Sequence, residues 1–218
     1  MQADRDLAAT QLLMSHLCHE LVSPIGAINN GIEMLEDFGG NELEPEAVGL
    51  IAESGKAAAA KLRFYRLAYG RAGQAADLGL RQCATASAEL LGSDARVALD
   101  WQAADTVRLV PGGPQLMLNL VVLAAGGLPR GGRLAVTVDA PGDARANRAA
   151  VRLAAAGVGA KLGDGVLAVI EGRDHALDHA NIHAWYCARL AAILGTAVRV
   201  ALSPDEVRLE VEIGRLVD

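Results

Sequence analysis

The sequence is poor in aromatic side chains, which make up 3% of its 218 residues. Hydrophobic residues nevertheless reach 52%, so a core has to be built mostly from alanine, leucine and valine. Cysteines are also few, and Cys18, Cys83 and Cys187 lie far apart in the chain. We therefore expect free thiols in a reducing compartment. The length allows one large domain or two small ones.

Further absences exclude whole classes of function. No apolar run reaches the roughly 18 residues that a membrane-spanning helix needs. The N-terminal residues lack a basic segment followed by an apolar one, so we expect no secretory signal and a cytoplasmic protein. Positive charge is not in excess either. The net charge of -6 would repel phosphate backbones, which argues against a nucleic-acid partner.

Apolar residues at heptad spacing predict a long helix over residues 4–37. The row and the residues beside it are Leu7, Met14, Leu17, Cys18, Leu21, Ile25, Ile28, Ile32 and Leu35. Such a row is typical of the apolar seam in a coiled-coil-like bundle. The sequence Gly39-Gly40-Asn41 predicts a turn after this helix.

A second helix is predicted from Pro45 to Tyr69, since proline suits the first helical turn. Its apolar stripe consists of Val48, Ile51, Gly55, Ala58, Leu62, Tyr65 and Tyr69. The helices would form an antiparallel hairpin that cannot bury both stripes by itself. Pairing of two hairpins into a four-helix bundle would bury them, so we predict a homodimer. The alternative is that the rest of the chain covers the stripe.

The remaining sequence predicts a separate domain. We place domain boundaries at 1–72 and 73–218, with residues 70–77 as a linker. Helices are expected at 77–91, 111–128 and 178–194, and strands at 96–101, 133–139, 148–155, 166–171, 197–202 and 206–213. This order favours the α+β class, with a layer of helices on a mostly antiparallel sheet.

His19 is the residue to which the first helix gives chemical interest. At about 100° per residue it lies about 140° around the helix from Met14, so it points away from the apolar seam. An imidazole nitrogen is a good nucleophile toward phosphorus and a good leaving group. Phosphoryl transfer demands mainly positioning and charge stabilisation, which an exposed histidine beside a docked partner satisfies. The predicted docking residues around it are Ser15, His16, Val22, Ser23, Gly26 and Asn30.

Neighbouring residues suggest how His19 is supported. The Glu20 carboxylate is placed to hydrogen-bond the other ring nitrogen and so fix the tautomer. Pro24 removes a backbone hydrogen bond and should kink the helix, while Gly26 lets a partner approach closely. Asn29, Asn30 and Gly31 are poor helix formers, and read either as a tolerated local weakness or as a polar, low surface for docking.

The string His19-Glu20-Leu21-Val22-Ser23-Pro24 resembles the phosphoacceptor box of sensor histidine kinases. This resemblance implies that His19 is the phosphorylated residue and Glu20 its acid/base helper. It places Ser23 where kinases carry a polar residue linked to phosphatase action.

The second domain resembles the ATP-binding (Bergerat-like) domain of the same kinases, in a degenerate form. Of the asparagine box Asn119 is present, but Leu123 replaces the second asparagine, and a hydrophobic side chain cannot ligate magnesium. The Asp-x-Gly-x-Gly motif reads Ala155-Ala156-Gly157-Val158-Gly159, without the aspartate that reads adenine. Glu171-Gly172-Arg173-Asp174 stands where a phosphate loop is expected. We therefore expect neither ATP binding nor autophosphorylation.

An acceptor hairpin joined to a degenerate kinase-like domain resembles the ChpT-type histidine phosphotransferases of alphaproteobacteria. The resemblance implies a dimeric carrier. It would take phosphoryl from the receiver domain of a CckA-like hybrid kinase and donate it to CtrA-like and CpdR-like response regulators. It would need no cofactor of its own, since the Mg²⁺ belongs to the receiver. Glu20 departs from the family, whose members often have aspartate there.

Other functions remain open from the sequence. The chain could be an active kinase, a dimeric scaffold, or a phosphatase that acts through Ser23 and water. Arg63 and Arg66 could stabilise phosphate or simply flank the bundle. His175, His179 and His183 have a spacing that suits metal binding, but we favour a solvated surface for them.

Overall fold

The computed structural model describes residues 2–38, 44–75, 77–92, 96–139 and 147–216. The predicted turn at Gly39-Gly40-Asn41 lies outside these residues. Contacts within the chain separate it into two units, residues 1–65 and 66–218. The sequence had suggested a boundary slightly later, between residues 72 and 73.

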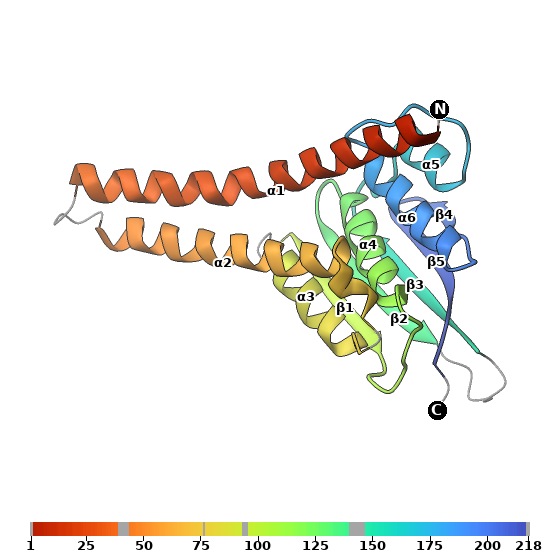
Figure 1. Ribbon diagram of the computed structural model, residues 1–218. Helices are drawn as coiled ribbons and strands as arrows, with labels where there is room; N and C mark the ends of the chain where they lie inside the picture. The colour runs from red at the N-terminus through yellow and green to blue at the C-terminus, as the bar shows by residue number, and fades with distance from the viewer. Residues whose placement is uncertain (1, 39–43, 76, 93–95, 140–146, 217–218) are drawn as a thin grey trace. The chain divides into compact units, whose positions relative to one another are not determined.

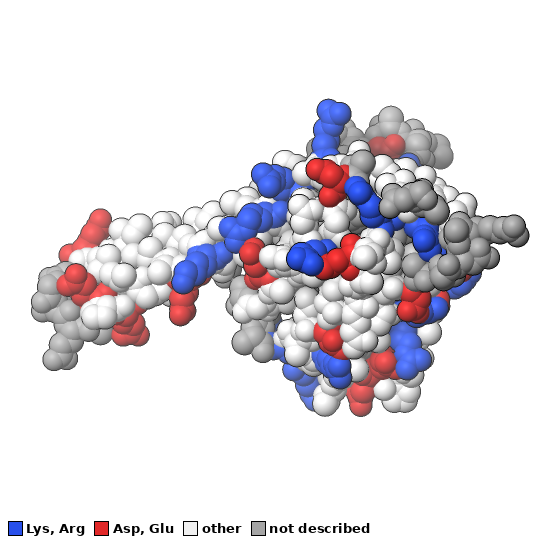
Figure 2. Space-filling model, turned by 90° about the horizontal axis from the view of Figure 1, so that it is seen from below, with Lys and Arg blue, Asp and Glu red and all other residues white. Residues whose placement is uncertain are grey.

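The first unit is a helical hairpin. Helix α1 spans Gln2–Phe38 and continues as an α-helix through Pro24, and α2 spans Glu44–Ala68, extending into the second unit. Acidic residues gather in the first turn of α2, and Arg66 lies in its last turn. Figure 2 shows the same trend, with acidic side chains toward the loop end of the hairpin and basic ones farther along it. This polarity complements the helix dipole of α2.

The second unit is built on a five-stranded mixed sheet in the order β1-β2-β3-β5-β4. Its strands are β1 (Val97–Ala103), β2 (Gly132–Asp139), β3 (Arg148–Ala156), β4 (Arg199–Ser203) and β5 (Glu206–Gly214). Only the β1–β2 pair is parallel, and the other pairs are antiparallel. The predicted class, a mostly antiparallel α+β domain, is confirmed.

Helices cover one face of this sheet, as Figure 1 shows for α3 (Leu80–Gly92), α4 (Gly113–Gly126) and α6 (Ile182–Ile193). Helix α4 is buried along almost its whole length, because it packs on β2, β3 and β5 and is flanked by α3 and α6. The inward residues of β3 and β5 alternate with exposed ones and supply much of the core. As the composition predicted, Leu, Val and Ala dominate this core.

The opposite face of the sheet carries charged side chains. Arg133 pairs with Asp100, and Arg152 bridges Asp139 and Glu210 across neighbouring strands. Such exposed pairs contribute little stability each.

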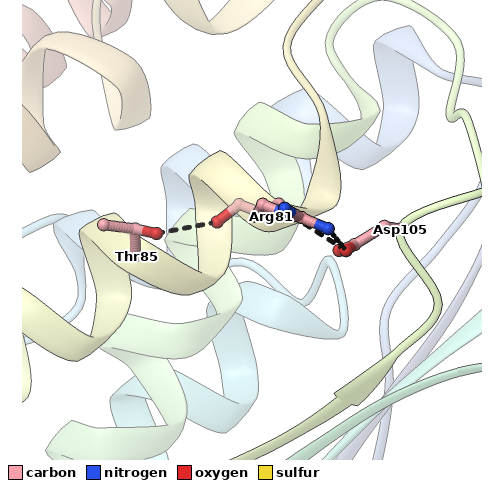
Figure 3. Close-up of polar contacts among 3 residues, drawn as sticks. All are labelled: Arg81, Thr85 and Asp105. Atoms are coloured by element: carbon pink, nitrogen blue, oxygen red, sulfur yellow. Dashed lines mark hydrogen bonds and ion pairs between the residues drawn. The ribbon is translucent and has the colours of Figure 1, made fainter.

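Another exposed pair connects α3 to the loop after β1 (Figure 3). The Arg81 Nε atom donates to the Asp105 carboxylate at 2.8 Å. The Thr85 hydroxyl, one turn further along α3, donates to the Arg81 carbonyl oxygen.

Three segments differ from the sequence prediction. Residues 166–171 were expected as a strand but lie mostly in helix α5 (Asp164–Ile170). Helix α6 begins at Ile182 rather than at Asp178, whose carboxylate instead accepts from the Ala180 and Asn181 amides in a preceding turn. The expected linker contains a 3-10 turn, η1 (Arg71–Gln74), which packs against α4. No described helix is long and apolar enough to cross a membrane.

Candidate functional site

Helix α1 has three faces that differ in their surroundings. One face meets α2: a methyl group at Gly31 would lie 2.6 Å from the Ile51 Cγ1 atom. A second face is apolar and exposed, with Met14 at 58% and Ile25 at 49%. His19 is exposed and belongs to neither face, since it lies about 120–140° from each at about 100° per residue. The imidazole is therefore accessible to a partner, as the sequence predicted.

The residues predicted to surround His19 are mostly accessible. Ser15, Val22, Ser23 and Asn30 are exposed, whereas His16 is half-buried. A methyl group at Gly26 would meet no atom within 4 Å, so this part of α1 offers no side-chain obstacle. The structure thus leaves Ser15, Val22, Ser23 and Asn30 exposed on the side of α1 that carries His19.

Glu20 is directed toward α2. Its Oε2 atom accepts a hydrogen bond from the Lys61 Nζ atom at 2.9 Å, and the Tyr65 hydroxyl also hydrogen-bonds this carboxylate. Burial by itself would raise the pKa of Glu20, but the hydrogen bond and charge of Lys61, helped by His16 and Tyr65, hold that pKa below its usual value. Burial and the neighbouring Glu20 charge raise the pKa of Tyr65, which stays protonated and able to donate. Glu20 is therefore a fixed carboxylate next in sequence to His19.

The sequence interpretation did not single out Lys61. A signal was nevertheless present, because this lysine falls within the stripe of α2 that also contains Ala58 and Tyr65. A lysine in such a stripe needs an acidic partner on the facing helix. That partner could not be named from the sequence, since it depends on the register of α1 against α2.

In the second unit, the side chain of Asn119 on α4 makes buried hydrogen bonds to the backbone. It is fully buried, and its Nδ2 donates to the Ala68 carbonyl oxygen at 2.6 Å and to the Gln115 carbonyl oxygen at 2.9 Å. The neighbouring Gln115 Nε2 donates to the Gly70 carbonyl oxygen at 3.2 Å. These amides hold the segment around Ala68 and Gly70 against α4.

The prediction that His183 is solvated was wrong. Its side chain is 7% exposed, because α6 turns it toward α4. The Nε2 atom lies 2.8 Å from the Asn119 carbonyl oxygen, which can only accept, so Nε2 carries the proton. In the neutral ring Nδ1 then accepts from the Tyr69 hydroxyl at 2.6 Å. His175 and His179 are exposed as predicted.

The other positions that resemble nucleotide-binding motifs are also buried or hydrogen-bonded within the protein. Ala155 and Leu123 both lie in the core. The amide of Gly157 donates to the Asp205 carbonyl oxygen at 2.9 Å, and the amide of Gly159 donates to the Asp205 carboxylate at 2.6 Å. The turn between β4 and β5 therefore occupies the amides of the loop at residues 157–159, here called the glycine loop. Among the described residues, no group of three His, Cys, Asp or Glu is placed to hold a metal ion.

The fold belongs to the class represented by the catalytic regions of sensor histidine kinases. The mycobacterial sensor histidine kinase MprB superposes with a TM-score of 0.50 at 16% identity, covering 65% of this chain and 97% of the kinase chain. A bacterial phosphotransferase superposes with a TM-score of 0.81 at 26% identity, covering 94% of this chain and 96% of the other.

Sequence comparison then assigns the family. Residues 80–206 match the family described as "Histidine phosphotransferase C-terminal domain", so the chain belongs to the histidine phosphotransferases. It is also similar to the protein phosphotransferase ChpT of Brucella abortus (strain 2308), at 39% identity. That similarity spans 62% of this chain and 61% of the relative's length. The predicted resemblance to ChpT-type proteins is confirmed.

Proposed function

We propose that this protein is a phosphorelay carrier that accepts a phosphoryl group on His19 and passes it to a response regulator. The observation that carries the proposal is the exposure of His19 on an open face of α1. Family membership supports the phosphotransfer chemistry. The donor would be the receiver domain of a CckA-like hybrid kinase, and the acceptors CtrA-like and CpdR-like regulators.

The chemistry needs little from this chain beyond a placed nucleophile. The lone pair of an unprotonated His19 nitrogen attacks phosphorus of the aspartyl phosphate, and a phosphorus–nitrogen bond forms as the bond to the aspartate oxygen breaks. The aspartate leaves as a carboxylate, and donation to the next receiver reverses these events. The Mg²⁺ that neutralises the phosphoryl charge would come with the receiver. Glu20, whose carboxylate is held by Lys61 and Tyr65 of α2, would help to fix the helical turn beside His19.

We further propose that the chain does not phosphorylate itself from ATP. In support, the one asparagine of the expected motif, Asn119, is fully buried and engaged by backbone carbonyl oxygens. Leu123 cannot ligate a hard cation. The glycine-loop amides at 157 and 159 are already bonded to Asp205.

A homodimer completes the proposal. Large apolar side chains are exposed along the hairpin outside the predicted docking surface: Leu7, Met14, Ile25, Ile32, Val48 and Leu62. Most of them continue the heptad rows, and a stable protein rarely leaves such a row in water. A second hairpin laid against this row would form a four-helix bundle and leave His19 outside it.

The test is transfer of radiolabelled phosphoryl from a phosphorylated receiver domain, with ATP alone as a parallel reaction. We expect acid-labile label on the wild type and on a His179→Ala control, and none on His19→Ala. His179 is a suitable control because it is an exposed histidine in the other unit. Label from ATP alone would show instead that the protein is a kinase.

Two other outcomes would replace the carrier proposal. If the receiver loses phosphate faster but no phosphohistidine accumulates, the protein is a phosphatase, and the exposed Ser23 becomes the residue to test. If no label appears and the receiver is unaffected, either the hairpin acts as a scaffold or this receiver is not its partner.

A further inference from the structure

Pro24 leaves a backbone oxygen of α1 without its usual donor. In an α-helix the carbonyl oxygen of residue i accepts from the amide of residue i+4. For Glu20 that residue is Pro24, which has no N–H group and whose ring crowds the same carbonyl. Pro24 is buried within the hairpin, where water cannot readily replace the missing donor. The helical turn that follows His19 therefore lacks one backbone hydrogen bond, the one that the Glu20 carbonyl oxygen would accept.

Lys61 supplies the missing donor from the facing helix. Its Nζ atom lies 2.9 Å from the Glu20 carbonyl oxygen and 2.9 Å from the Glu20 Oε2 atom. One ammonium group thus engages the backbone and the side chain of the residue that follows His19. The lysine side chain is 19% exposed, so both bonds are partly shielded from water.

Tyr65 makes the arrangement more rigid. It follows Lys61 by one helical turn on α2, is 7% exposed, and hydrogen-bonds the same carboxylate. With two donors from α2, the Glu20 side chain has little freedom to rotate. The orientation of the turn at residues 19–20 is consequently tied to α2.

We propose that Lys61 is a positioning residue for phosphoryl transfer, which restores the hydrogen bond removed by Pro24 and so fixes the turn that bears His19. The proposal rests on the proposed carrier function of His19. It assigns Lys61 a backbone task, which an acid–base helper or a simple salt bridge would not require.

A double-mutant cycle separates this task from others. We would compare the wild type with Lys61→Met, Pro24→Ala and the double variant, because alanine at position 24 returns an amide to the Glu20 carbonyl. The assay is single-turnover transfer from a phosphorylated receiver, with the maximal rate and the half-saturating concentration measured separately. Lys61→Met should lower the maximal rate about tenfold by loosening the reacting geometry, with little change in half-saturation. In the Pro24→Ala background the same substitution should slow transfer less than about threefold.

Matched variants sharpen the reading. Lys61→Arg should recover much of the rate, and Lys56→Met, an exposed lysine on the same helix, should transfer like the wild type. In a Glu20→Gln background the charge pair is absent. The effect of Lys61→Met measured there therefore reports the backbone hydrogen bond. A full transfer rate in Lys61→Met, or equal slowing with proline and with alanine at position 24, would overturn the proposal.

Thermal unfolding of the same four proteins tests the hydrogen bond without reference to transfer. Lys61→Met should lower the melting temperature more with proline than with alanine at position 24. If the wild type takes up no label, the carrier function fails and Lys61 loses its role in transfer. The unfolding cycle then still tests whether Lys61 replaces the missing amide. An equal loss of melting temperature with proline and with alanine at position 24 would show that it does not.

Discussion

The two units of this chain differ in whether their motif residues are exposed to solvent or buried. In the hairpin His19 and a row of large apolar side chains are exposed. In the sheet unit the residues that resemble nucleotide-binding positions, such as Asn119 and Ala155, are buried in the core. The proposed chemistry and the proposed dimer contacts both lie in the hairpin, whereas the sheet unit buries its motif positions in its core.

The largest effect is expected from charge placed in the exposed apolar row. Leu62→Glu should convert the proposed dimer into a monomer, because each subunit would bury an unpaired carboxylate in the bundle. Light scattering would then report 22.6 kDa instead of twice that mass. Ile193→Glu is the control, since Ile193 is a 76% exposed apolar residue of the sheet unit. A wild type that is monomeric at high concentration would contradict the dimer.

A smaller effect should come from the buried amide of the sheet unit. Asn119→Leu keeps the branched shape of the side chain but leaves the Ala68 carbonyl oxygen without this donor, which should cost about 1–3 kcal/mol of unfolding free energy. Gln102→Leu, an exposed amide on β1, should change stability by less than about 0.5 kcal/mol. Denaturant titration measures both. Equal stabilities would mean that Asn119 does not hold the segment at Ala68 in place.

Two glycines of α1 offer a comparison within one helix. Gly31→Ala would place a methyl group 2.6 Å from the Ile51 Cγ1 atom and should destabilise the hairpin by about 1–3 kcal/mol. Gly26→Ala meets no atom within 4 Å, and should stabilise it by up to about 1 kcal/mol through helix propensity. Thermal unfolding measures the difference, and the same sign for both would contradict the packing described. Gly26→Ala should nonetheless slow transfer if a partner docks closely there.

The sequence predicted elements far better than contacts between them. Heptad rows and period-two strands located both long helices and most of the sheet. The strand prediction for residues 166–171 was wrong because a short apolar segment with β-branched residues fits a strand as well as a buried helix. His183 was misplaced because its histidine spacing says nothing about which face of α6 meets α4.

The same limitation applies to the candidate site. His19 and its neighbours follow from one helix and a known motif, so their exposure could be predicted from helical geometry. Glu20 with Lys61 could not, since their meeting depends on how α1 and α2 align. The replacement of the Pro24 amide by a lysine is visible only when both helices are placed.

The smallest effect should come from titrating the Glu20 carboxylate. Its pKa is lowered in the folded protein from 4.5, so ionised Glu20 contributes stability that is complete above pH 4.5 and is lost as the pH falls through the lower folded pKa. Glu20→Gln should therefore melt at a lower temperature than the wild type near neutral pH, and the difference should shrink on acidification below 4.5. The pair with Lys61 is only partly shielded, so the shift should be modest. Glu53→Gln, at an exposed position of α2, serves as the control. A difference between wild type and Glu20→Gln that stays constant with pH would show that Glu20 stabilises the hairpin through packing and not through its charge.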